Sequence, residues 1–330
     1  MPPANFDTAI YAMLLGFFIN VAISPFVIPF LIKLKFGQNV RDDGPKSHFV
    51  KSGTPTMGGV MILFSFVAAS LFFLRDNRDG LMLIFVTVGF GLVGFLDDYI
   101  KIVKKRALGL RAYQKIIAQV LVSVIFLAYL RVEDSGYFGA SFSEIVMPFV
   151  RGVKLDLGVL YYPFVIFVMI GTVNSVNLTD GLDGLASGVT LLVSTFFIFM
   201  AFAAGSGSFP IVAAAAGSLL GFLLFNAHPA KVFMGDTGSL ALGGLIAALA
   251  IMLKMSLFLP LIGVIYVIEA ISDIIQVAYY KATKKRVFKM APIHHTFELS
   301  GWPETKVVTL FLIVTAIACL VGFLGAKPYL

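Results

Sequence analysis

Residues 80–98 read GLMLIFVTVGFGLVGFLDD, an apolar stretch that ends on the adjacent aspartates Asp97 and Asp98. Its length lies in the range of roughly 17–25 residues that a helix needs to cross a bilayer. Ionisable groups at a membrane segment are costly in free energy, so they usually mark a functional site. The stretch therefore predicts a membrane helix with chemistry at its end.

The whole chain shares this apolar character. Of its 330 residues, 59% are hydrophobic and 13% are charged, whereas a soluble domain carries about 25% charged residues. No segment is polar enough for a separate soluble domain, so we expect one integral-membrane domain over residues 1–330. The first apolar run has no basic segment before it, which favours a retained span over a signal peptide. The one cysteine, Cys319, excludes a disulfide framework.

Apolar stretches of similar length recur along the chain. They predict an all-α polytopic membrane protein with about ten transmembrane helices. An even number of spans places both termini on one side of the membrane. The expected spans cover residues 6–32, 57–74, 80–98, 113–130, 158–174, 186–204, 209–226, 237–253, 258–280 and 306–325.

Basic residues decide the predicted orientation. Most of them fall in one set of loops, which the positive-inside rule makes cytoplasmic, so both termini are expected to be extracytoplasmic. The loops of this set are residues 33–56, 99–112, 175–185, 227–236 and 281–305. Much of the net charge of +7 is therefore a topology signal and a contact with anionic lipid headgroups, and we expect no nucleic-acid binding.

Three carboxylate motifs fall on this predicted cytoplasmic face. Asp97 and Asp98 end the third expected span, Asp180 and Asp183 follow the fifth, and Asp236 opens the eighth. Mg²⁺ commonly takes one or two carboxylates together with substrate phosphate oxygens. The motifs therefore predict a divalent metal and a phosphate-bearing substrate at an active site on the cytoplasmic face.

Each motif also has a purely structural interpretation. Lys101 lies four residues after Asp97, so the two side chains could form an ion pair along a helix. Asp236 could be the N-cap of its helix. The polar residues between Asn174 and Gly184 could simply form turns.

Other patterns carry less weight. Gly89–Gly94 matches the G-x-G-x-x-G pattern, but it lies in a span with no preceding strand, so helix packing explains it better than dinucleotide binding. The sequence has no Walker-type P-loop, which argues against an ATP-driven pump. Glu269 and Asp273, four residues apart in the ninth expected span, either line the groove or pair with basic residues.

A series of motifs beyond single aspartates carries a family resemblance. They occur, in order, at Asp42–His48, Lys51–Gly59, Gly94–Asp98, Asn177–Gly184, Phe233–Gly244, Met290–His295 and Gly301–Glu304. Together they resemble the MraY family of phospho-N-acetylmuramoyl-pentapeptide transferases, within the polyprenyl-phosphate N-acetylhexosamine-1-phosphate transferase superfamily. The Thr54–Gly59 and Pro292–His295 segments point to this family specifically. One departure is Thr296, where the family commonly has a third histidine.

This resemblance implies an enzyme of peptidoglycan biosynthesis in the bacterial cytoplasmic (inner) membrane. Its substrates would be UDP-N-acetylmuramoyl-pentapeptide and undecaprenyl phosphate, its products lipid I and UMP, and its cofactor Mg²⁺. A homodimer is a further implication. Direct attack of the lipid phosphate on the β-phosphorus is favoured over an aspartyl-phosphate route, because metal and lysines can bring two anions together without a covalent intermediate.

The resemblance also implies which residues form the site. Asp97, Asp98, Asp236 and His294 would be catalytic, with Mg²⁺ on Asp236 and Asp97 and with Asp98 positioning or deprotonating the attacking phosphate. Phe233 would stack on uracil. The implied substrate contacts are Lys51, Lys115, Asn174, Asn177, Asp180, Asp183, Asn226, Phe233, Gln276 and His295.

Two other functions stay open. A sister transferase that uses UDP-N-acetylglucosamine would share the aspartates, but the Pro292–His295 segment argues against it. An ion-coupled transporter would place carboxylates near the bilayer midplane and contain internal repeats. Here most carboxylates lie at one predicted face and no repeat is visible.

Overall fold

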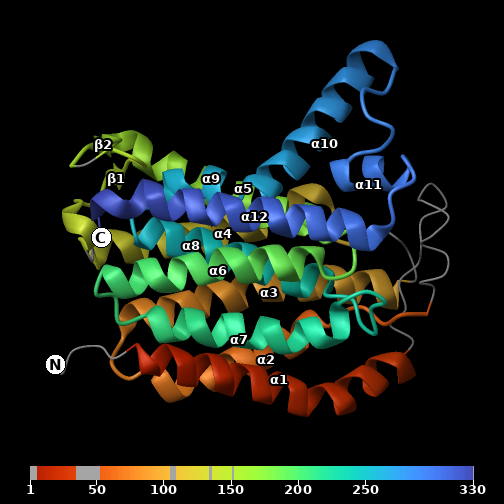
Figure 1. Ribbon diagram of the computed structural model, residues 1–330, viewed down its shortest axis with the longest axis horizontal. Coiled ribbons are helices and arrows are strands. Elements are labelled where there is room, and N and C mark those ends of the chain that lie inside the picture. The colour runs from red at the N-terminus through yellow and green to blue at the C-terminus, as the bar shows by residue number, and fades with distance from the viewer. Residues whose placement is uncertain (1–5, 35–52, 105–108, 134–135, 151, 330) are drawn as a thin grey trace.

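The computed structural model describes residues 6–34, 53–104, 109–133, 136–150 and 152–329. Nearly all regular structure in these ranges is helical, and most long helices share one axis (Figure 1). The α-helices are α1 (Asp7–Lys33), α2 (Gly59–Phe73), α3 (Arg78–Val103), α4 (Ala112–Val132), α5 (Tyr161–Thr179), α6 (Leu185–Ala203), α7 (Phe209–Asn226), α8 (Gly235–Met252), α9 (Leu259–Ile262), α10 (Val264–Thr283), α11 (Ile293–Glu298) and α12 (Glu304–Ala326).

Helix α8 forms the centre of the bundle. It packs against α2, α3, α5 and α6, and every residue from Thr237 to Met252 is buried. Glycines allow the backbones to approach closely: a Cβ at Gly94 of α3 would overlap the Asp236 carbonyl oxygen, and one at Gly243 would lie 2.6 Å from Val173 Cα. Such close approach is a main source of helix association in membranes. The packing interpretation of Gly94 is confirmed, and the start of α8 is held from several sides.

The number of spans is slightly lower than expected. Eight of the described helices are long and apolar enough to cross a membrane, and α9 with α10 would make a ninth. The expected span 57–74 is α2, an apolar helix of only 15 residues. The expected span 258–280 is broken at Gly263, where α9 and α10 meet at an angle of 82°. The Gly263 N–H donates to the Leu259 carbonyl and closes α9 before α10 begins.

Beyond this break, α10 leaves the bundle and projects away from it (Figure 1). Its outward residues are apolar and exposed, and they include Ile268, Ile271 and Ile274. Glu269 and Ser272 lie on the buried side of the same helix. The amphipathic pattern therefore directs isoleucines outward and one carboxyl group into the protein.

The expectation of a purely α-helical chain misses one short β-hairpin. Strand β1 (Glu144–Val146) pairs antiparallel with β2 (Lys154–Asp156). The loop between the strands docks on the segment that follows α12, where the Tyr329 hydroxyl lies 2.9 Å from the Met147 carbonyl oxygen and 3.0 Å from that of Val150. Three-residue strands are too short for a period of two to show in the sequence. The hairpin, the start of α1 and the end of α12 share one end of the bundle, and α11 lies at the other (Figure 1).

Candidate active site

Asp98 joins α3 to the first turn of α8. The backbone N–H groups of Asp236 and Thr237 donate to its two carboxylate oxygens at 3.2 and 2.9 Å, and the Thr237 hydroxyl donates at 2.8 Å. The side chain is 4% exposed. The first N–H groups of a helix have no partner within it, and its N-terminus favours negative charge. Asp98 therefore caps α8 from another helix, an N-capping role that the sequence interpretation had considered for Asp236 instead.

Asp236 collects three donors just inside this terminus. Its carboxylate accepts from Lys115 Nζ at 2.9 Å, from Lys101 Nζ at 3.1 Å and from Asn177 Nδ2 at 2.9 Å. Asn177 also donates to the Ser239 hydroxyl at 2.8 Å. Helices α3, α4, α5 and α8 thus each contribute a polar group to one point. The structure brings together the predicted residues Asp236, Lys115 and Asn177.

Asp97 completes a group of three carboxylates. It accepts from Lys101 Nζ at 2.6 Å and from the Leu110 N–H at 2.8 Å. Oxygens of Asp97, Asp98 and Asp236 all lie within 4.8 Å of one another, a separation at which they could hold a metal ion. Lys101 Nζ lies among them, 3.8 Å from Asp98. The helical ion pair expected from the spacing is present, and the same ammonium also reaches a carboxylate 135 residues away.

The turn after α5 lies next to this group. Asp180 is half-buried, and burial raises the pKa of its carboxyl group well above the ordinary value, with further increases from the Asp236, Asp98 and Asp183 carboxylates. Ahead of it, Asn174 donates to Gln119 Oε1 at 2.8 Å and accepts from Gln119 Nε2 at 3.3 Å. Gln119 was not predicted, because a single glutamine within an apolar run gives no sign of its partner.

Asp183 lies on the far side of the same turn and is 4% exposed. Its Oδ2 lies 3.0 Å from His228 Nδ1 and accepts from the Ala230 N–H at 3.0 Å. The Asp183 N–H donates to Glu304 Oε1 at 2.7 Å. Asp183, His228 and Glu304 form a second group whose atoms could hold a metal ion. Neither His228 nor Glu304 was predicted as a site residue.

Two predicted substrate contacts have their polar atoms engaged within the protein. Asn226 is 3% exposed, accepts from the Ser187 hydroxyl at 2.7 Å and donates to the Val232 carbonyl at 3.0 Å. Gln276 accepts from the N–H groups of Val287 and Phe288, both at 3.0 Å. In this arrangement Asn226 orders the segment before Phe233, and Gln276 orders the loop after α10.

The segment Pro292–His295 packs against the turn after α5. His294 is fully buried, and its Nδ1 lies 3.0 Å from Glu269 Oε2 of α10. On its other side, the ring leaves no room for a Cβ at Gly181. His295 Nδ1 lies 2.9 Å from Glu298 Oε2. Of the two interpretations of Glu269, the structure shows a pairing, but with a histidine of α11.

Three further features predicted from the sequence are Thr296, Phe233 and Lys51. The Thr296 hydroxyl donates to the Met290 carbonyl at 2.6 Å, so the residue that replaces a third histidine closes its own loop. Phe233 is half-buried beside α2, where its N–H donates to the Pro55 carbonyl and its carbonyl accepts from the Gly58 N–H. Lys51 lies outside the described residues.

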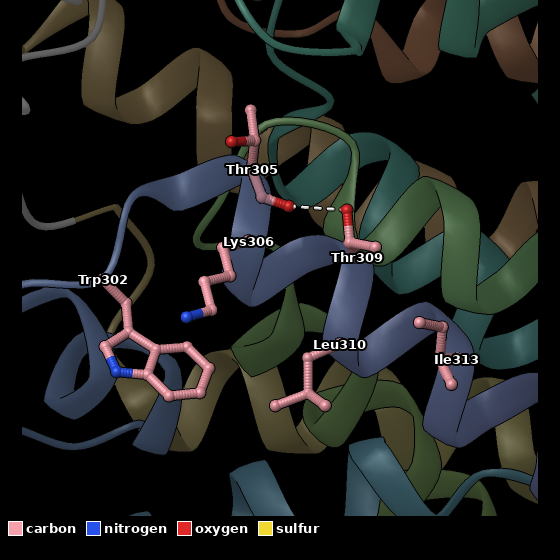
Figure 2. A pocket seen from close by; sticks show the side chains of 6 residues that line it. All are labelled: Trp302, Thr305, Lys306, Thr309, Leu310 and Ile313. Carbon is pink, nitrogen blue, oxygen red and sulfur yellow. Dashed lines mark hydrogen bonds between the residues drawn. The ribbon is translucent and has the colours of Figure 1, made fainter.

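A surface hollow at the start of α12 contains none of the predicted residues (Figure 2). Lys306 Nζ lies 4.2 Å from the centre of the Trp302 ring. An aromatic ring and a lysine at the start of a span are typical of an interfacial anchor. The lining residues are Trp302, Thr305, Lys306, Thr309, Leu310 and Ile313.

Comparisons with known proteins identify the family of the chain. Residues 80–254 match the model of glycosyl transferase family 4, and residues 51–63 match the phospho-N-acetylmuramoyl-pentapeptide-transferase signature 1. Phospho-N-acetylmuramoyl-pentapeptide-transferases from Acetivibrio thermocellus and Clostridium kluyveri are 50% and 52% identical to the chain. The alignments cover 98% and 96% of this chain, and 97% and 98% of the two relatives. The chain therefore belongs to the phospho-N-acetylmuramoyl-pentapeptide-transferase family.

Proposed function

We propose that this chain transfers phospho-N-acetylmuramoyl-pentapeptide from UDP-N-acetylmuramoyl-pentapeptide to undecaprenyl phosphate, forming lipid I and releasing UMP. The observation that carries the proposal is the meeting of three carboxylates and two lysine ammonium groups at the start of α8. The reaction brings an anionic phosphate against an anionic pyrophosphate, so catalysis depends on positioning and on compensating negative charge. Family membership supports the identity of the substrates, and this cluster supports the chemistry.

Positive charge for the substrates comes from the chain itself. Lys101 and Lys115 both contact Asp236, and the N-terminus of α8 adds the partial positive charge of a helix end. Pyrophosphate oxygens that enter the cluster would become new partners for the two ammonium groups. The lysines would then hold the UDP-sugar and offset repulsion of the incoming lipid phosphate.

The donor set fits Mg²⁺. Carboxylate oxygens are the ligands that this ion prefers, and Lys101 Nζ lies where Asp97 and Asp236 together stabilise a cation. Asp97 and Asp236 would hold the ion, and Asn177 would orient the Asp236 carboxylate through its 2.9 Å hydrogen bond. When bound, Mg²⁺ supplies positive charge to the pyrophosphate and to the oxygen of the leaving UMP.

The contacts of Asp98 favour an anchoring role over proton transfer. Three donors from Asp236 and Thr237 engage its two oxygens. A phosphate monoester has a second pKa near 6, so the lipid phosphate is largely dianionic at neutral pH and needs little help from a base. We therefore favour direct attack on the β-phosphorus, with Asp98 fixing the start of α8.

The proposal places the cluster at the cytoplasmic face of the bacterial inner membrane. The basic loops support this orientation through the positive-inside rule. A soluble nucleotide would arrive from the cytoplasm, while the polyprenyl phosphate would arrive laterally from the bilayer. A homodimer remains a prediction from the family.

The test is UMP release by the purified protein in detergent, supplied with UDP-N-acetylmuramoyl-pentapeptide, undecaprenyl phosphate and Mg²⁺. We expect release that EDTA abolishes and that Asp236→Ala reduces by at least about 100-fold, the size of losing one preorganised charge. UDP-N-acetylglucosamine serves as the substrate control. Turnover of that control instead would assign the chain to the sister transferases, and no UMP from either substrate by folded protein would contradict a transferase.

A further inference from the structure

We propose that His228 is a positioning residue for the nucleotide site, acting through Asp183 and Glu304. This inference rests on the proposed function and deepens it. The three side chains come from the turn after α5, from the loop between α7 and α8, and from the first residue of α12. They join three segments that are far apart in the sequence but surround the same part of the site.

The geometry makes the imidazole the link between two carboxylates. His228 Nδ1 lies 3.0 Å from Asp183 Oδ2 and 3.4 Å from Glu304 Oε2. An ionised carboxylate can only accept, so Nδ1 carries the proton and donates it to Asp183, with Glu304 Oε2 beside it. The side chains of Asp183 and Glu304 are 2% and 9% exposed, whereas that of His228 is 40% exposed. The ring therefore covers two buried acceptors from the solvent side.

Backbone hydrogen bonds extend the link in both directions. The Ala230 N–H donates to the same Asp183 oxygen at 3.0 Å, which fixes the loop that leads to Phe233 and Asp236. The Asp183 N–H donates to Glu304 Oε1 at 2.7 Å, which fixes the turn that contains Asp180. One Asp183 oxygen is thus held by two donors, and this sets the direction of the whole carboxyl group.

The consequence concerns nucleotide affinity more than the chemical step. His228 is not among the groups that contact Asp97, Asp98 or Asp236 in the carboxylate cluster. Loss of its N–H would release Asp183 and loosen both the Asp180 turn and the loop before Phe233. The KM for the UDP-sugar should therefore rise, while kcat and the KM for the lipid phosphate should change little.

The experiment compares His228→Phe, which keeps a ring but removes the donor, with His228→Asn, whose amide N–H can take the place of Nδ1. We expect His228→Phe to raise the KM for the UDP-sugar about tenfold, the size of losing one hydrogen bond to a charged group. His228→Asn should restore most of this loss. Ala227→Ser, at an exposed neighbour in the same loop, is the matched control and should behave like wild type.

A second measurement keeps the inference separate from the proposed function. Calorimetric titration of the full-length protein with UDP should show the same tenfold weakening in His228→Phe, whether or not UMP is released. Glu304→Gln, in which an amide NH₂ replaces one of the two acceptor oxygens, is the second variant if His228→Phe does not fold, and it should weaken UDP binding in the same direction.

Three outcomes would overturn the inference. One is wild-type UDP affinity and KM in folded His228→Phe, or in Glu304→Gln should the first variant not fold. Another is a tenfold loss of kcat in His228→Phe with both KM values unchanged. The third is a stoichiometric transition metal, measured by elemental analysis of the purified protein and lost in His228→Phe, since the cluster would then be a metal site. Failure of wild-type protein to bind UDP would overturn the proposed function as well.

Discussion

Lys101 is the residue on which the charge balance of the site depends most. Its ammonium lies within 4 Å of Asp97, Asp98 and Asp236. We expect Lys101→Ala to lower kcat/KM for the UDP-sugar by about 10²–10³-fold, the range for removing one preorganised charge. Lys101→Arg, which keeps the charge, should retain more activity in the UMP-release assay. Equal losses in the two variants would show that shape rather than charge matters here.

Asp98 offers a way to separate anchoring from proton transfer. Asp98→Asn keeps the size of the side chain but places an amide NH₂ against the N–H donors of α8. We expect a loss of about 1–3 kcal/mol in the free energy of unfolding, the cost of an unsatisfied buried polar group. Thermal unfolding in detergent measures this change. A variant as stable as wild type but inactive would instead support the role of a base.

Asp180 predicts a pH dependence of stability. Burial, followed by the neighbouring carboxylates, raises the pKa of its carboxyl group, so the folded state holds this proton more tightly than the unfolded chain. Stability from this source is complete below about pH 4, the unfolded pKa, and is lost as the pH rises through the folded pKa. Without divalent metal, Asp180→Asn should therefore gain stability relative to wild type as the pH increases. A difference in the free energy of unfolding between Asp180→Asn and wild type that stays constant with pH would contradict this.

The contact between α3 and α8 decides whether the site forms. A Cβ at Gly94 would overlap the Asp236 carbonyl oxygen, so Gly94→Ala must push the two helices apart. We expect a destabilisation of about 1–3 kcal/mol, typical of overpacking, together with loss of UMP release. Gly171→Ala is the matched control, because no atom lies within 4 Å of its added Cβ.

The helices differ in how far the sequence predicts them. The long apolar stretches predicted most of the long helices, and three of the aspartates at their ends do lie together. The break at Gly263 was not predictable, because both halves of the segment are apolar. Asp98 as a cap was equally hidden, since its donors are backbone N–H groups more than 130 residues away. Pairings such as His228 with Asp183 exist only after distant segments fold together.

The orientation of the protein in the membrane can be measured directly. The one native cysteine, Cys319, is buried, so single cysteines can be introduced on a Cys319→Ser background. Val153 of the hairpin region and Lys285 after α10 are both exposed. In sealed right-side-out vesicles, an impermeant maleimide should label Val153→Cys at once and Lys285→Cys only after detergent. The reverse pattern would contradict the predicted orientation.

The short helix α2 has a consequence for the bilayer around the enzyme. Its 15 residues span about 22 Å, whereas the hydrocarbon core of a bilayer is about 30 Å thick. α2 begins at Gly59, where a Cβ would overlap Gly238 in the first turn of α8. We expect a helix this short to favour a locally thinner membrane. Headgroups would then lie closer to the carboxylates, and turnover should depend on the acyl-chain length of the host membrane.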